Sequence, residues 1–248
     1  MKSKLITSPS DRSERIILKR FTLLRFLRLN LYTIADIVGL LLNISSRQGV
    51  HTTLLAMERD GLLRRETVEA NNRRWTLWGI TPHGQALAFD PASNEQPESK
   101  YFEAGRVGLS VLAHTLELQR LSIMADRAGW TDWRLGDRLG KWQAGQSRPD
   151  ALVRSPAGVV YAVECERTIK TVKRYEAILV DRLQAIKRGD FAHCVWLCQT
   201  HDLSERLRAI ITSITELNVA GSRIQIQDRH RATLHFAAFE DFPNNVQV

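Results

Sequence analysis

The sequence predicts an α/β protein (α+β overall) with two domains: an N-terminal helical domain with a β-hairpin, and a C-terminal αβββαβ domain with a mixed central sheet. Three observations support this prediction. Apolar residues recur at helical spacing through much of the first third of the chain. Residues 90–101 contain two prolines and no periodic apolar pattern, as is typical of a linker. Beyond them, short runs typical of strands are flanked by helical patterns. We therefore expect domains at 1–89 and 102–248.

Charge and composition restrict the class of protein. The 248-residue chain has a net charge of +8, and residues 1–80 carry fourteen Lys or Arg against seven Asp or Glu. This basic first third favours a nucleic-acid partner. The apolar runs are too short to cross a bilayer, and residues 1–10 lack the apolar core of a signal peptide. We expect a cytoplasmic protein without membrane insertion, whose three cysteines are buried thiols rather than zinc ligands.

The first domain is predicted to contain three helices and a hairpin. The helices are expected over residues 11–30, from a cap at Thr33 through residue 41, and from a cap at Ser45 or Ser46 to Asp60-Gly61. Two alternating runs, 62–68 and 73–80, then predict a hairpin that turns at residues 70–72.

These elements resemble the winged helix-turn-helix family over residues 14–88, including the closing Thr81-Pro82-His83-Gly84. The resemblance implies that the third helix reads DNA and that arginines of the hairpin, or wing, contact phosphates. The residues available for these contacts are Arg47, Gln48, His51, Thr52 and Thr53 on the helix, and Arg64, Arg65, Arg73 and Arg74 on the wing. A winged helix used only for protein contact is the alternative.

The second domain is predicted to open with a long, largely buried helix over residues 104–127, on which His114 and Glu117 share a face. The remaining elements are expected as strands at 130–135, 150–153 and 159–166, a helix at 169–188, a central buried strand at 192–199, a helix at 203–217, and strands at 223–226 and 233–239.

Three carboxylates mark the ends of two of these strands. Asp150 opens one strand, and Glu164 and Glu166 alternate at the end of the next, so the two glutamates share a face. Unpaired carboxylates are costly in a buried sheet. Three acids there predict a hard divalent cation, Mg²⁺ or Mn²⁺, and hydrolysis of a phosphate ester. The alternative for Asp150 is a turn cap.

The order of elements, together with Pro149-Asp150 and Glu164-Cys165-Glu166, resembles the restriction-endonuclease-like, or PD-(D/E)XK, core. The resemblance implies that Asp150 and Glu164 are metal ligands. Glu166 stands where that family has its catalytic lysine. Either Glu166 is a third ligand or a general base, or the lysine has moved, to Lys170 by preference or to Lys173.

A winged helix joined to such a core resembles the replication-relaxation family, and within it the MobC-type relaxases of mobilisable plasmids. The resemblance covers nearly the whole chain. It implies a metal-dependent endonuclease that nicks one DNA strand at a plasmid transfer origin, with accessory mobilisation and coupling proteins as partners. It is carried by residues 81–84, His114, Glu117, Arg148-Pro149-Asp150, residues 164–170 and Lys173-Arg174-Tyr175.

Several roles have alternatives. Glu117 could reach the metal or be solvated, and His114 could be catalytic or a core histidine. Tyr175 could be a covalent nucleophile, although a tyrosine on an amphipathic helix usually packs. Lys170, Lys173 and Arg174 could bind phosphate as surface charges. The alternative function is a non-enzymatic, winged-helix regulator of plasmid replication or transcription, with the nuclease fold as a dimerisation scaffold; a homodimer is thus a possible assembly.

Overall fold

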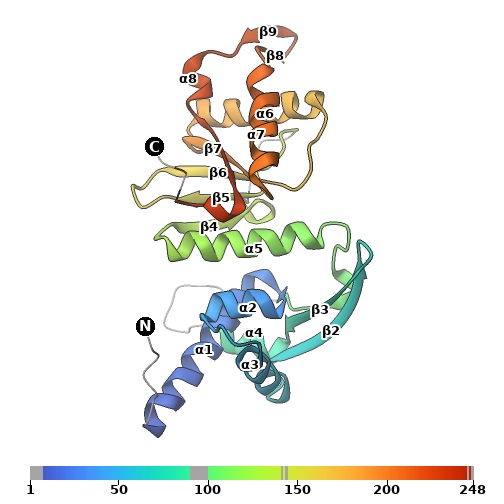
Figure 1. Cartoon of the computed structure of the whole chain (residues 1–248), viewed down its shortest axis with the longest axis vertical. Helices are drawn as coiled ribbons and strands as arrows, with labels where there is room; N and C mark the ends of the chain where they lie inside the picture. The colour runs from blue at the N-terminus through green and yellow to red at the C-terminus, as the bar shows by residue number, and fades with distance from the viewer. Residues whose placement is uncertain (1–7, 90–99, 141, 143–144, 245, 247–248) are drawn as a thin grey trace. The chain divides into compact units, whose positions relative to one another are not determined.

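The computed structural model describes residues 8–89, 100–140, 142, 145–244 and 246 of a mixed α/β chain (Figure 1). The chain forms two compact units, residues 1–120 and 121–248. The division falls within helix α5 (Leu112–Arg127), whereas the predicted linker is at 90–101, of which residues 90–99 lie outside the described part. No helix among the described residues has the length and apolar character needed to cross a membrane.

In the described part of the first unit, helices α1 to α4 pack with a three-stranded sheet of order β1-β3-β2. Buried Leu27, Val38, Leu54 and Trp78 belong to a core that joins the helices to the strands. The elements are α1 (Pro9–Asn30), β1 (Tyr32–Thr33), α2 (Ala35–Leu42), α3 (Arg47–Arg59), β2 (Leu63–Ala70), β3 (Arg73–Ile80) and α4 (Pro82–Ala88).

Local residue chemistry accounts for the boundaries of α3 and of the hairpin. The Ser46 hydroxyl accepts a hydrogen bond from Gly49 N at 3.0 Å and caps α3, as predicted. Gly61 has a φ of +70° and ends the turn after that helix. Asn71 and Asn72 have φ values of +52° and +55° and form the two-residue loop between β2 and β3. This backbone geometry favours asparagine and glycine, and it matches the twist of a hairpin.

The predicted cap at Thr33 is wrong. The N-cap of α2 is Ile34, because Thr33 lies in β1 and its hydroxyl donates to Gln119 Oε1 at 2.7 Å. Gln119 Nε2 in turn donates to Tyr32 O at 2.8 Å, so α5 begins in the first unit and is attached to β1.

The second unit contains a five-stranded mixed sheet of order β10-β7-β6-β5-β4. Strands β4, β5 and β6 are antiparallel, and β6, β7 and β10 are parallel. Helices α6 and α7 cover one face of this sheet (Figure 1). The elements are β4 (Thr131–Leu135), β5 (Ala151–Arg154), β6 (Val160–Glu166), α6 (Val172–Arg188), β7 (His193–Cys198), α7 (His201–Ser213), β8 (Glu216–Val219), β9 (Ser222–Gln225), α8 (Asp228–Arg231) and β10 (Leu234–Ala238). Strand β7 is a buried interior strand between β10 and β6, in agreement with the prediction that it is not an edge strand.

Three predicted boundaries in this half of the chain are wrong. The helix expected from residue 104 begins at Leu112; Gly105 and Gly108 are poor helix formers, and only residues 104–106 make a 3₁₀ turn. The helix expected from residue 169 begins at Val172, because the Thr171 hydroxyl accepts from Arg174 N and caps it. The helix expected to reach residue 217 ends at Ser213, and the strand expected at 223–226 pairs as β9 with β8, apart from the main sheet.

Candidate active site

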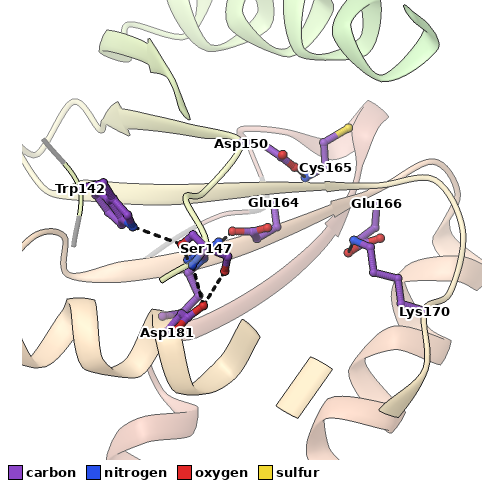
Figure 2. A network of polar contacts seen from close by, with 9 residues as sticks. Trp142, Ser147, Asp150, Glu164, Cys165, Glu166, Lys170 and Asp181 are labelled. Atoms are coloured by element: carbon purple, nitrogen blue, oxygen red, sulfur yellow. Dashed lines mark hydrogen bonds and ion pairs between the residues drawn. The ribbon is translucent and has the colours of Figure 1, made fainter. Parts of the chain in front are cut away.

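Asp150 and Glu164 lie next to each other at the ends of neighbouring strands. Ala151 pairs with Val163 in the antiparallel register of β5 and β6, and Asp150 N donates to Val163 O at 3.0 Å. Continuing this register by one residue places Asp150 beside Glu164. The Asp150 carboxylate accepts a hydrogen bond from Cys165 N at 2.8 Å, which fixes its position against β6 (Figure 2).

Glu164 forms a buried ion pair with Arg182 of α6. Arg182 Nε donates to Glu164 Oε1 at 2.5 Å, and the two side chains are 1% and 8% exposed. Burial raises the pKa of Glu164 to about 7; Arg182 opposes this shift and the charge of Asp150 adds to it. Burial lowers the pKa of Arg182, but the charges of Glu164, Cys194 and Asp181 and the hydrogen bond to Glu164 together raise it by more, so the guanidinium remains charged.

The segment before β5 holds Arg182 in place. Arg182 Nη1 donates to Ser147 O at 2.7 Å. Ser147 itself donates to Asp181 Oδ2 from its backbone N at 2.8 Å and from its hydroxyl at 2.7 Å (Figure 2). Trp142 Nε1 also donates to Ser147 O, at 3.3 Å. These bonds connect Asp181 and Arg182 of α6 to the residues leading into Asp150.

Glu166 forms a second ion pair, with Lys170. Both glutamates point to the same side of β6, as the alternation of the strand predicts (Figure 2). The Glu166 side chain is 3% exposed, whereas that of Lys170 is 40% exposed. Lys170 lies in the loop before α6, where its backbone N donates to Tyr175 Oη at 3.0 Å.

Tyr175 is fully buried, and burial raises the pKa of its hydroxyl to about 12. A buried phenol that already accepts a hydrogen bond is poorly suited to attack phosphorus. The packing interpretation of Tyr175 therefore agrees better with its surroundings than the nucleophile interpretation does.

The donor chemistry at Asp150 and Glu164 fits a magnesium-type cation in part. The described residues contain no group of three or more His, Cys, Asp and Glu side chains arranged to hold a metal ion. Magnesium is, however, commonly bound through one or two carboxylates and several waters. Asp150 and Glu164 are two such carboxylates; burial is the main cause of the raised pKa of Glu164, and repulsion by the charge of Asp150 adds to it. A cation between them would relieve this repulsion.

Comparison with protein-family models, with curated proteins and with solved structures finds no match. The function of the chain must therefore be inferred from its own residues.

His114 and Glu117 are half-buried in the N-terminal half of α5, within the first unit. Asp150, Glu164, Glu166 and Lys170 belong to the second unit. The structure describes the two units separately, so the predicted catalytic role of His114 and the predicted metal role of Glu117 stay predictions.

The expected DNA-contacting residues of the first unit lie on the start of α3 and on the β2–β3 hairpin. Arg47, Gln48 and Thr52 are exposed, whereas His51 is half-buried and packs edge-on against Trp78, with ring centroids 6.4 Å apart. Thr52 and Thr53 hydroxyls donate to backbone carbonyls one turn earlier, which occupies their hydrogens.

The four wing arginines are all exposed but differ in their partners. Arg64 pairs with Glu66, and Arg65 lies 3.7 Å from Glu58 and over the ring of Trp78. Arg73 stacks on Trp75 at 4.2 Å, and Arg74 lies opposite Glu69 in the hairpin register. Lys173 and Arg174 are exposed in the first turn of α6, in the second unit.

The sequence reasoning missed Arg182, Asp181 and Ser147. A signal for Arg182 was present: it lies on the apolar stripe of α6, seven residues after Tyr175 and among Ile178, Leu179 and Ala185. A charge at such a position requires a buried partner of opposite sign. Glu164 and Glu166 were the available acids.

Proposed function

We propose that this chain binds DNA through its first unit and nicks one DNA strand, in a divalent-metal-dependent reaction, at Asp150 and Glu164. The observation that carries the proposal is the position of Asp150 and Glu164 opposite each other on neighbouring strands, where the charge of Asp150 contributes to the raised pKa of Glu164. Lys170 lies in the loop that follows β6. Carboxylate pairs with an adjacent ammonium are suited to cleavage of phosphate esters.

The arrangement of elements supports the same proposal. After α5, which the two units share, the order β4-β5-β6-α6-β7 and the mixed sheet of the second unit agree with a restriction-endonuclease-like core. In the first unit, three helices followed by a hairpin agree with a winged helix-turn-helix. The basic first third of the sequence adds the charge that a DNA-binding surface needs.

The proposed division of roles follows from the contacts. Asp150 and Glu164 would hold the cation, and Arg182 keeps Glu164 oriented from the buried side. Glu166 holds Lys170, whose partly exposed ammonium could meet a phosphate oxygen. A bound Mg²⁺ or Mn²⁺ would activate a water molecule and offset charge on the phosphate. In this account Glu166 positions Lys170, which takes the role of the family's catalytic lysine. The alternative is that Glu166 itself is a third metal ligand or a general base.

The resemblance to the replication-relaxation family extends the proposal to a substrate. A relaxase of mobilisable plasmids acts in the cytoplasm on a transfer origin, with accessory mobilisation and coupling proteins. Lys173 and Arg174, exposed beside Lys170 in sequence, are proposed to bind the backbone of the same DNA.

A nicking assay tests the enzymatic proposal. Supercoiled plasmid with a candidate transfer origin is incubated with the protein and Mg²⁺ or Mn²⁺, and relaxed circles are quantified on a gel. The wild type should produce relaxed circles, and Asp150→Asn should lose this activity while retaining DNA binding. Asp202→Asn, on the exposed surface of α7, is the matched control and should behave as the wild type. No relaxed circles with the wild type, or equal yields with Asp150→Asn, would remove the enzymatic proposal.

One observation favours the non-enzymatic alternative. Glu164 and Glu166 each have a cationic partner within the protein, so both charges are already compensated without a metal. If the wild type does not nick but binds DNA, the second unit is a scaffold and the chain is a DNA-binding regulator.

DNA binding itself is tested by its salt dependence. Affinity should fall as log salt rises, with a slope set by the number of phosphates neutralised. Arg73→Gln/Arg74→Gln should reduce that slope by about 1–2, because each phosphate contact contributes about 0.9. Arg206→Gln, which removes an exposed arginine of α7, should leave the slope unchanged. A salt-independent affinity of the wild type would contradict the assigned surface.

A further inference from the structure

The second unit contains a cavity that the proposed nuclease chemistry does not use. It lies between α6, the β8–β9 hairpin and α8, and has a volume of about 540 Å³. Val180 and Leu183 of α6, Leu217 of β8, and Ile226 after β9 form apolar walls. This volume and lining are typical of small-molecule sites, which range from about 300 to 1,000 Å³.

The cavity has basic groups beside the neutral polar side chains of Gln184, Gln225 and Thr233. Lys187, Arg229 and His230 line it, and no acidic side chain is found among its described lining residues. Lys187 and Arg229 have no carboxylate partner within the described part of the chain, whereas their neighbours Arg188 and Arg231 bond to Asp190 and to Ile214 O.

His230 is oriented by its own helix. Its Nδ1 accepts a hydrogen bond from Gln227 N at 3.1 Å, which makes Nε2 the protonated nitrogen of the neutral ring. Nε2 of His230 is thus a hydrogen-bond donor, in addition to the cations Lys187 and Arg229. Apolar walls with three basic groups and no acid are complementary to a molecule with an apolar body and an anionic head.

We propose that this cavity binds a small amphiphilic anion, such as a medium-chain or aromatic carboxylate. The apolar body would lie against Val180, Leu183 and Leu217, and the head group would be held by Lys187 and Arg229. The favourable free energy of binding would come from the apolar surface that is removed from water and from charge-assisted hydrogen bonds to the head group. The proposal is independent of nuclease activity.

Calorimetric titration of the full chain with octanoate, 1-octanol and octyltrimethylammonium tests it. Octanoate should bind at one saturable site and more tightly than the other two. Arg229→Gln should weaken octanoate about tenfold, the loss expected for one charge-assisted bond, with a smaller effect on 1-octanol. Arg206→Gln removes the same charge from an exposed position of α7 and should change nothing.

A second variant separates the cavity from adventitious binding. Val180→Trp fills the apolar space and should abolish octanoate binding, with an unchanged far-ultraviolet circular dichroism spectrum as the control for folding. Lack of saturable octanoate binding would overturn the proposal. Equal affinity for the three probes, or unchanged binding by folded Val180→Trp, would also overturn it.

Discussion

Glu164 and Glu166 lie two residues apart on the same side of β6, and both are buried, yet their partners differ. Arg182, the partner of Glu164, is 1% exposed and belongs to the packed face of α6. Lys170, the partner of Glu166, is 40% exposed and lies in a loop. The first pair is thus part of the protein interior, and the second ends in an ammonium that a ligand can reach. The two cations therefore differ: Arg182 stabilises the fold from the buried side, whereas the ammonium of Lys170 is accessible to a ligand.

The largest expected effect comes from breaking the buried pair. Arg182→Met would leave the Glu164 carboxylate buried without its cation and should lower the free energy of unfolding by about 3–5 kcal/mol. Urea unfolding followed by circular dichroism measures this loss. Arg188→Met, at the exposed end of the same helix, removes a pair with Asp190 and should cost less than about 1 kcal/mol. Equal losses in the two variants would contradict the assignment.

An intermediate effect is expected on the opposite face of the same strand. Tyr161 stacks there on His193, and His193 Nδ1 lies 3.0 Å from His235 Nε2. Burial, together with the charges of His193 and Arg208, lowers the pKa of His235 to about 4. In the unfolded chain the pKa of this histidine is about 6.5. Below that pH the unfolded chain therefore binds more protons than the folded protein does.

The stability contributed by neutral His235 is complete above pH 6.5 and is lost as the pH falls toward 4. Because the ring is only half-buried, the loss should be about 1 kcal/mol. His235→Gln should flatten the curve of unfolding free energy over this range when compared with the wild type. Parallel curves would show that other groups cause the acid sensitivity.

A smaller loss of stability than that of Arg182→Met, with a large effect on activity, is expected at the exposed end of the second pair. Lys170→Met leaves the buried Glu166 carboxylate without its cation, but it should lower the free energy of unfolding by less than Arg182→Met does, because the Lys170 ammonium is partly exposed to water. If the proposed nicking is correct, the nicking rate should fall by about 100-fold, as for loss of an electrostatic stabiliser of the transition state. Lys170→Arg should recover part of the rate. A Met variant that nicks normally would show that Lys170 only neutralises Glu166.

Features set by local sequence were predictable, and those set by distant contacts were not. Ser46 as a helix cap, the hairpin loop at Asn71 and Asn72, and the alternation of Glu164 and Glu166 follow from short-range rules. Thr33 failed as a cap because its hydroxyl bonds to Gln119, 86 residues away.

The candidate site shows the same limit. The register of β5 and β6 that brings Asp150 beside Glu164 was anticipated by the strand pattern and the short turn between them. The partner of Glu164 was not, because Arg182 reaches it only through the packing of α6 on the sheet. Sequence spacing identifies which side chains share a face, but not which charge on another element pairs with each of them.

Binding of Mn²⁺ to the full chain, measured by calorimetry at neutral pH, tests most directly whether Asp150 and Glu164 form the cation site while Glu166 is committed to Lys170. One Mn²⁺ should bind to the wild type and to Glu166→Gln, and Asp150→Asn should lose this binding. No Mn²⁺ binding by the wild type, or loss of binding in Glu166→Gln with retention in Asp150→Asn, would contradict the account.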